Sequence, residues 1–171
     1  MALLEDGVLS PDELADLPGV PCQDRLSQGP VAVIECAQEI PCNPCEQACR
    51  QGAIHIGACI TDLPELDEEK CTGCGLCIAA CPGQAIFVVD MTHSETRASV
   101  QLPYEFRPLP KRGDAVAALN RAGEPICEGS VLRVLNPHRH DRTAVVTVEV
   151  PKACAMDVRN IALKGKDDNG E

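Results

Sequence analysis

Four closely spaced cysteines constrain this chain more than any other feature. They occur in the run Cys71-Thr72-Gly73-Cys74-Gly75-Leu76-Cys77-Ile78-Ala79-Ala80-Cys81-Pro82, whose spacing is C-x2-C-x2-C-x3-C followed by proline. Three thiols at such short intervals wrap a tight loop around one object, and Gly73 and Gly75 let the backbone approach it closely. This spacing is typical of an iron–sulfur cluster, whereas structural zinc sites usually place two close cysteine pairs far apart. We therefore interpret the run as an iron–sulfur site.

An internal repeat predicts a second site of the same kind. When the chain is shifted by 32 residues, Cys42, Cys45 and Cys49 superimpose on the last three cysteines of the run, and Ala53-Ile54 superimposes on Ala85-Ile86. In two-cluster proteins, the fourth cysteine of each run ligates the other cluster, and a repeat of this kind is typical of such paired modules. Cluster 1 is therefore predicted to bind Cys49, Cys71, Cys74 and Cys77. Cluster 2 is predicted to bind Cys42, Cys45, Cys81 and one further residue.

The fourth ligand of cluster 2 is not at the expected place. Glu39 stands where the repeat calls for a cysteine, and Cys36 lies three residues earlier. We predict Cys36 as the ligand, in a C-x5-C-x2-C-x3-C motif. The longer spacer needs a different loop, whose turns Pro41 and Pro44 can fix. The alternatives that the sequence leaves open are Cys22, Cys59, Glu39 through oxygen, and a three-iron cluster.

Composition agrees with metal-stabilised packing. The 171 residues include 12 cysteines but no Trp, one Tyr and two Phe, so the core buries less apolar area and needs other support. No apolar run approaches the roughly 18 residues of a membrane span, and the first residues lack the basic and apolar segments of a signal peptide. We therefore expect a cytoplasmic protein whose thiols bind metal rather than form disulfides. Four cysteines remain, which we expect to be small buried apolar residues: Cys22, Cys59, Cys127 and Cys154.

Acidic side chains are concentrated in the first part of the chain. Residues 1–91 carry 15 acidic and 3 basic side chains, whereas residues 92–171 carry 11 acidic and 12 basic ones. Nucleic-acid phosphates would be repelled by the acidic part, so we expect no nucleic-acid partner. The acidic surface suits either a basic docking surface on a protein partner or solubility alone.

Local patterns divide the chain into units. Ser10-Pro11-Asp12-Glu13 is a capping box that predicts a short helix ending before Pro18, and Pro151 is expected to open another that reaches Ile161. Short runs rich in apolar residues predict strands at residues 86–89, 115–119, 131–135 and 143–150. We expect an N-terminal extension over residues 1–30, a cluster-binding domain over 31–91, a β-rich domain over 98–163 and a flexible tail over 164–171.

The run of residues 71–82 resembles the bacterial dicluster ferredoxins, over roughly residues 31–91. A closer resemblance covers most of the chain, to the ferredoxin-like iron–sulfur subunits of FAD-dependent amino-acid dehydrogenases of the proline, hydroxyproline and opine type. The segments that carry it are Glu35-Cys36, Ile40-Pro41-Cys42-Asn43-Pro44-Cys45, Cys81-Pro82-Gly83-Gln84-Ala85-Ile86 and Leu102-Pro103-Tyr104-Glu105-Phe106. The resemblance implies a bacterial dicluster ferredoxin-like domain. The predicted strands of the second half, separated by Gly and Pro at short intervals, indicate a small antiparallel β-barrel or β-sheet domain after it, and the expected fold class is therefore α+β.

The same resemblance implies a role in a redox complex. In such assemblies, flavin subunits oxidise an amino acid or secondary amine, and iron–sulfur centres carry the electrons onward. We therefore expect two [4Fe–4S] clusters on this chain and FAD on a partner subunit. The hetero-oligomer can include a further [2Fe–2S] subunit.

No catalytic constellation is visible in the sequence. We find no nucleophile–base set, phosphate loop or dinucleotide fingerprint, so we expect a non-catalytic electron-transfer subunit that relays single electrons. One alternative is a free soluble ferredoxin that serves several redox enzymes, although the extra β-rich domain argues against it. Another is an iron–sulfur redox sensor, which the unassigned Cys22 and Cys59 leave open.

Overall fold

Short helices and nine β-strands make up the part of the chain that the computed structural model describes, residues 2–164. The helices are α1 (Ala2–Asp6), α2 (Pro11–Ala15), α3 (Gln23–Leu26), α4 (Pro44–Ala48) and α5 (Leu76–Ala80), with 3-10 turns at His138–His140 and Lys152–Cys154. The strands are β1 (Val31–Ile34), β2 (Ile54–His55), β3 (Glu65–Leu66), β4 (Ile86–Asp90), β5 (Arg97–Tyr104), β6 (Ala115–Leu119), β7 (Pro125–Leu135), β8 (Ala144–Pro151) and β9 (Asn160–Leu163). Residues 165–171 of the predicted tail lie outside the described residues.

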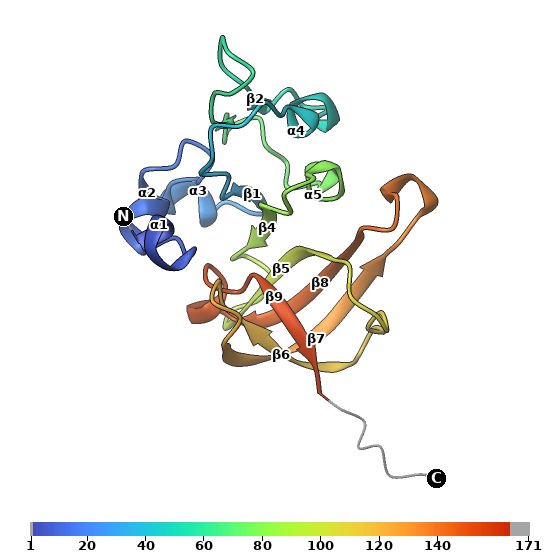
Figure 1. Cartoon of the computed structure of the whole chain (residues 1–171). Coiled ribbons are helices and arrows are strands. Elements are labelled where there is room, and N and C mark those ends of the chain that lie inside the picture. The colour runs from blue at the N-terminus through green and yellow to red at the C-terminus, as the bar shows by residue number, and fades with distance from the viewer. Residues whose placement is uncertain (1, 165–171) are drawn as a thin grey trace.

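One antiparallel sheet of seven strands organises the fold. Its order is β1-β4-β5-β8-β7-β6-β9, while β2 and β3 form a separate pair. Helices α4 and α5 and the β2–β3 pair lie above one end of the large sheet (Figure 1). The expected mixed fold with a mostly antiparallel sheet is therefore confirmed. The hydrogen-bonded order of the described strands is open, running from β1 to β9, and residues 91–96 connect the paired strands β4 and β5.

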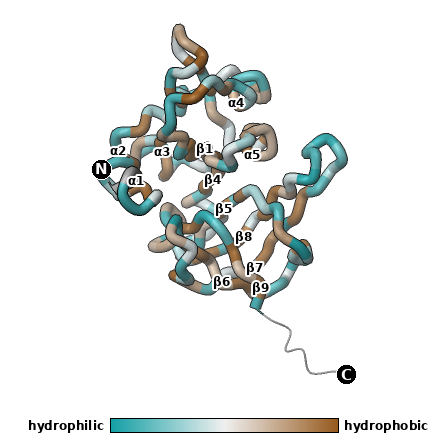
Figure 2. Tube along the Cα trace, viewed as in Figure 1, coloured by the Kyte–Doolittle hydropathy of each residue, from teal (hydrophilic) through white to brown (hydrophobic). Residues whose placement is uncertain are grey.

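Aliphatic side chains on the sheet form the main core. Along β8 the buried residues Val146, Val148 and Val150 alternate with the half-buried Thr147 and Glu149, as expected where one face of a sheet packs inward. Figure 2 shows hydrophobic segments along the strands, whereas the β7–β8 connection is hydrophilic. This core holds the second part of the chain together with few aromatic side chains, as the composition requires.

The 32-residue sequence repeat is also a structural repeat. Helix α5 begins 32 residues after α4 and has the same length, and the two helices pack against each other. The pair Ile54–Leu66 of the β2–β3 ladder corresponds to the pair Ile86–Ile34 of the β4–β1 ladder under the same shift. The two sequence halves therefore have equivalent helices and strand pairs beside their candidate ligands.

The local predictions for helices and strands were mostly accurate. Ser10 caps α2 and Glu13 closes the capping box, and β6 has the predicted bounds. Strand β7 begins at Pro125, earlier than predicted, and contains a bulge between Val131 and Arg133. The helix expected from Pro151 to Ile161 was wrong: after one 3-10 turn the chain forms β9, because pairing with β6 overrides the local preference.

Among residues 2–164, no helix has both the length and the apolar character that a membrane span requires.

Candidate metal centres

The structure groups eight cysteines around two hollows. Hollow 1 lies between the two repeat halves, and its wall contains four thiol-bearing residues: Cys49, Cys71, Cys74 and Cys77. The rest of the wall is mostly apolar or small, and includes Ala32, Ile54 and Val88. This is the set that the sequence predicted for cluster 1.

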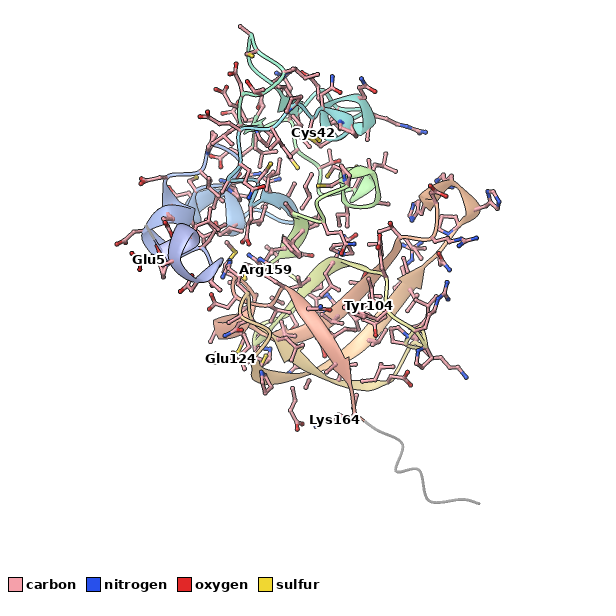
Figure 3. The ribbon with its side chains drawn as sticks, viewed as in Figure 1. Glu5, Cys42, Tyr104, Glu124, Arg159 and Lys164 are labelled. Carbon is pink, nitrogen blue, oxygen red and sulfur yellow. The ribbon has the colours of Figure 1, made fainter. Side chains whose placement is uncertain are left out.

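Hollow 2 has a similar wall, which is also built from residues of both repeat halves. Its wall also contains four cysteines: Cys36, Cys42, Cys45 and Cys81. Apolar neighbours include Ile34, Ile56 and Ile86. The structure thus brings Cys36 to the three cysteines with which the sequence grouped it. Cys42 lies in the loops at the top of the view in Figure 3, near α4.

The crosswise grouping has a local backbone cause. Cys45 and Cys77 lie within α4 and α5, whereas Cys49 and Cys81 are the residues that end these helices. Both terminal residues have an extended conformation, with φ/ψ of −78°/97° and −78°/112°. The chain therefore turns away from each helix at that residue, and the terminal cysteine reaches the hollow of the other repeat half.

Backbone amides donate hydrogen bonds to three of these sulfur atoms. Ala53 N lies 3.2 Å from Cys49 Sγ, and its repeat equivalent Ala85 N lies 3.5 Å from Cys81 Sγ. Ala32 N lies 3.4 Å from Cys71 Sγ. Such donors stabilise negative charge on ligand sulfur and favour the reduced state of a bound cluster.

The thiols of Cys77 and Cys45 are poorly suited to ionise without a bound cation. Burial raises the pKa of the Cys77 thiol to about 12, and the charges of the other three thiols of hollow 1 add to this shift. Burial likewise raises the pKa of Cys45 to about 11, with further contributions from Cys81 and Cys42. A metal ion that binds thiols removes their protons outright. The donor set of each hollow, four thiols in an apolar wall, fits an iron–sulfur cluster.

The four thiols of each hollow surround an open volume. Within residues 2–164, no group of three or more His, Cys, Asp or Glu side chains is placed so that all of them could bind one metal ion. In a cluster, the thiolates bind separate corners of a larger iron–sulfide core, so they lie farther apart than around a single ion.

Two glycines shape the loop between Cys71 and Cys77. Gly73 and Gly75 have φ of +63° and +76°, a left-handed region that other residues rarely adopt. A Cβ at Gly73 would lie 2.6 Å from the Pro30 carbonyl carbon, and one at Gly75 would lie 2.7 Å from Gln101 Oε1. Both glycines line hollow 1, and each lies so close to a neighbouring residue, Pro30 or Gln101, that a Cβ would collide with it.

Replacing Gly73 by alanine is expected to impair hollow 1. The left-handed conformation alone costs about 1–2 kcal/mol for a residue with a Cβ, and the Pro30 backbone must also move. We expect a melting temperature lower by at least about 2 °C and a reduced iron content, measured by calorimetry and iron quantitation. The control is Gly83→Ala, because a Cβ at Gly83 meets no atom within 4 Å. Equal effects of the two substitutions would contradict this prediction.

The alternative ligands lie elsewhere. Cys22 is exposed and donates a hydrogen bond to Glu68 Oε1 at 3.0 Å, and Cys59 is exposed with its sulfur 3.0 Å from Thr61 Oγ1. Glu39 is exposed and is not part of the wall of hollow 2. The expectation that Cys22 and Cys59 are buried was wrong, because Cys22 is the exposed N-cap residue of α3 and Cys59 lies in an exposed bend. Cys127 and Cys154 are half-buried against the main core.

Sequence reasoning missed three charged residues beside hollow 2. Glu35 directly precedes Cys36, and its side chain is only 7% exposed. Arg121 and Arg159 contact its carboxylate from the second half of the chain. Burial by itself would raise the pKa of Glu35, but the hydrogen bonds from these arginines outweigh it and hold the pKa below its usual range. No sequence pattern links residues so far apart.

The comparison with known proteins agrees with the chemistry of the thiols. No curated protein and no solved structure matches the chain. Residues 64–87, which include the four cysteines of the run that begins at Cys71, match the family model for the 4Fe-4S binding domain. The chain therefore contains a 4Fe–4S binding domain of the ferredoxin type, which supports an iron–sulfur cluster and a role as an electron carrier.

Proposed function

We propose that this chain is an electron-transfer subunit with two [4Fe–4S] clusters, one in each hollow. The observation that carries the proposal is the crosswise grouping of eight cysteines into two sets of four, one of which includes three cysteines of the matched domain. When bound, each cluster accepts and releases one electron at a time. Two such clusters divide the electron pair of a reduced flavin into single steps.

The residues of the chain hold, insulate and tune the clusters. Apolar side chains such as Ile54 and Ile86 exclude water from the hollows, which lowers the local dielectric around the thiolates. The two repeat halves differ in their surroundings, since Arg50 stands where the other half has Pro82. The two clusters are therefore expected to have different reduction potentials, which favours directed transfer.

The partner in this proposal is a flavin enzyme. The resemblance to small subunits of FAD-dependent dehydrogenases supports an electron donor that oxidises an amino acid or related secondary amine in the cytoplasm. The acidic first part of the chain supports docking against a basic surface on that partner. FAD would reside on the partner, and the chemical step would take place there.

Native purification tests this proposal. A tagged chain isolated under gentle conditions is expected to copurify with a flavoprotein, identified by mass spectrometry and flavin release. Adding the amine substrate without an acceptor should bleach the iron–sulfur absorbance in the complex. A chain that elutes alone as a monomer, with clusters reduced by several unrelated reductases, would instead support a free ferredoxin.

A further inference from the structure

A buried group of three charged residues joins hollow 2 to the second half of the chain. Arg121 donates hydrogen bonds to both Glu35 carboxylate oxygens, at 3.0 and 2.6 Å. Arg159 Nε donates to Glu35 Oε1 at 2.8 Å, and its Nη2 lies 2.6 Å from the same oxygen without hydrogen-bond geometry. Both guanidinium groups are held in turn by backbone carbonyls, those of Met156 and Val158. Arg159 lies between the α-helical part and the sheet (Figure 3).

The repeat shows that this arrangement replaces a local one. Glu35 is the repeat equivalent of Asp67: Glu35 N donates to Ala85 O and Asp67 N donates to Ala53 O, each at 2.8 Å. Asp67 then forms a turn of its own, because Lys70 N donates to its Oδ1 at 3.2 Å and Cys71 N donates to its carbonyl at 3.2 Å. That turn places Cys71 at hollow 1.

The other half of the repeat has no such turn at Glu35. Cys36 follows Glu35 directly, whereas Cys71 comes four residues after Asp67. The side chain of Glu35 is buried and its carboxylate contacts are made by residues 86 and 124 positions away. Cys36 is therefore linked through Glu35 to the second half of the chain. Cys71 is held by the Asp67 turn and by Arg25 and Ala32, all within the first part of the chain.

We propose that Arg121 and Arg159 are positioning residues for Cys36, so that the β-rich second half of the chain completes the binding site in hollow 2. This inference rests on the proposed function, since it requires a cluster in that hollow. Removing either arginine leaves a buried carboxylate with too few partners, a strongly unfavourable state. The segment that carries Glu35 is then expected to shift toward water, and Cys36 shifts with it.

The charges of this group give a second consequence. Arg121 also pairs with the carboxylate of Asp157, 3.1 Å from its Nη1. The two guanidinium groups and two carboxylates therefore balance, and removing one arginine leaves the group net negative beside hollow 2. Arg159 also stacks on Phe87, with 4.6 Å between its guanidinium carbon and the ring centroid, and its side chain is 5% exposed. Positive charge near a cluster favours its reduced, more negative state. Removing one arginine is therefore expected to lower the reduction potential of cluster 2 alone.

The test compares Arg159→Met with Arg159→Lys in the full chain. Iron quantitation, electron paramagnetic resonance at controlled potentials, and the rate of iron loss to a chelator are measured for each. Arg159→Met is expected to lose cluster 2 iron about 10-fold faster than the unsubstituted chain, the usual scale for residues that orient a metal ligand. Cluster 1 serves as the internal control and should keep its signal and potential. Arg159→Lys retains the charge and should recover most of the cluster 2 signal.

Controls separate this inference from the proposed function and from general destabilisation. Arg97→Met removes another arginine of the second half, which pairs with Glu149 away from Glu35, and should change neither cluster. If Arg159→Met loses both clusters, the measurement is repeated on Arg121→Met. The Arg121 side chain is more exposed than that of Arg159, so its removal should destabilise the fold less. If cluster 2 loses iron at the same rate and has the same reduction potential in Arg159→Met and Arg121→Met as in the unsubstituted chain, the inference is overturned. An unsubstituted chain with only about four iron atoms, instead of the eight of two [4Fe–4S] clusters, would overturn the two-cluster proposal itself.

Discussion

Replacing Cys36 by serine is expected to halve the iron content, from about eight to about four atoms per chain, as the loss of one [4Fe–4S] cluster requires. Cys36 is one of four thiols around hollow 2, and burial together with the charge of Cys81 raises its thiol pKa. A serine hydroxyl in that place ionises less readily than a thiol and is a poorer ligand for iron. Iron and sulfide quantitation with electron paramagnetic resonance measures the result.

The other candidate ligands provide the controls. Cys22→Ser and Cys59→Ser remove thiols that are exposed and hydrogen-bonded to Glu68 and Thr61, so both variants should keep two clusters. Glu39→Gln tests the oxygen ligand and should also be without effect. Two intact four-iron clusters in Cys36→Ser would remove Cys36 from the site.

Removing iron from the whole chain is expected to open the first part of the molecule and leave the second part folded. The smaller hydrophobic cluster contains Cys45 and Cys77 among its buried residues, and it borders both hollows. Without a bound core, these thiols no longer tie α4 and α5 to the strands, because metal binding free energy contributes directly to folding. Hydrogen exchange measured by mass spectrometry should show that the amides of α4 and α5 lose protection.

The sheet of the second part of the chain serves as the internal reference for the hydrogen-exchange measurement. The main core around Val100, Leu102 and Val148 is built from aliphatic side chains of the sheet, so the amides of β7 and β8 should keep their protection after chelation. Protection of α4 and α5 that persists without iron would show that packing alone holds them. Loss of protection in every strand would show that the two parts unfold as one unit.

Much of the candidate site could be predicted because its determinants are local. The spacing of the run from Cys71 to Cys81 and its 32-residue repeat correspond to two short helices with the same bounds under the shift. Glycine at position 73 suits the observed loop because glycine adopts a positive φ without strain. Strand β6 was predictable from its apolar run, whereas β9 was not, because its strand conformation depends on pairing with β6.

The sequence by itself grouped seven of the thiols, since ligand spacing and repetition are properties of neighbouring residues, and it left Cys36 as one of several candidates for the eighth ligand. Only the tertiary structure decided how Cys36 is held, through the burial of Glu35 between Arg121 and Arg159. It also decided that Cys22 and Cys59 face the surface. The physical reason is the same in each case, because burial and ion pairing depend on which distant segments pack together. A single sequence shows no pattern that would predict contacts between residues 86 or 124 positions apart.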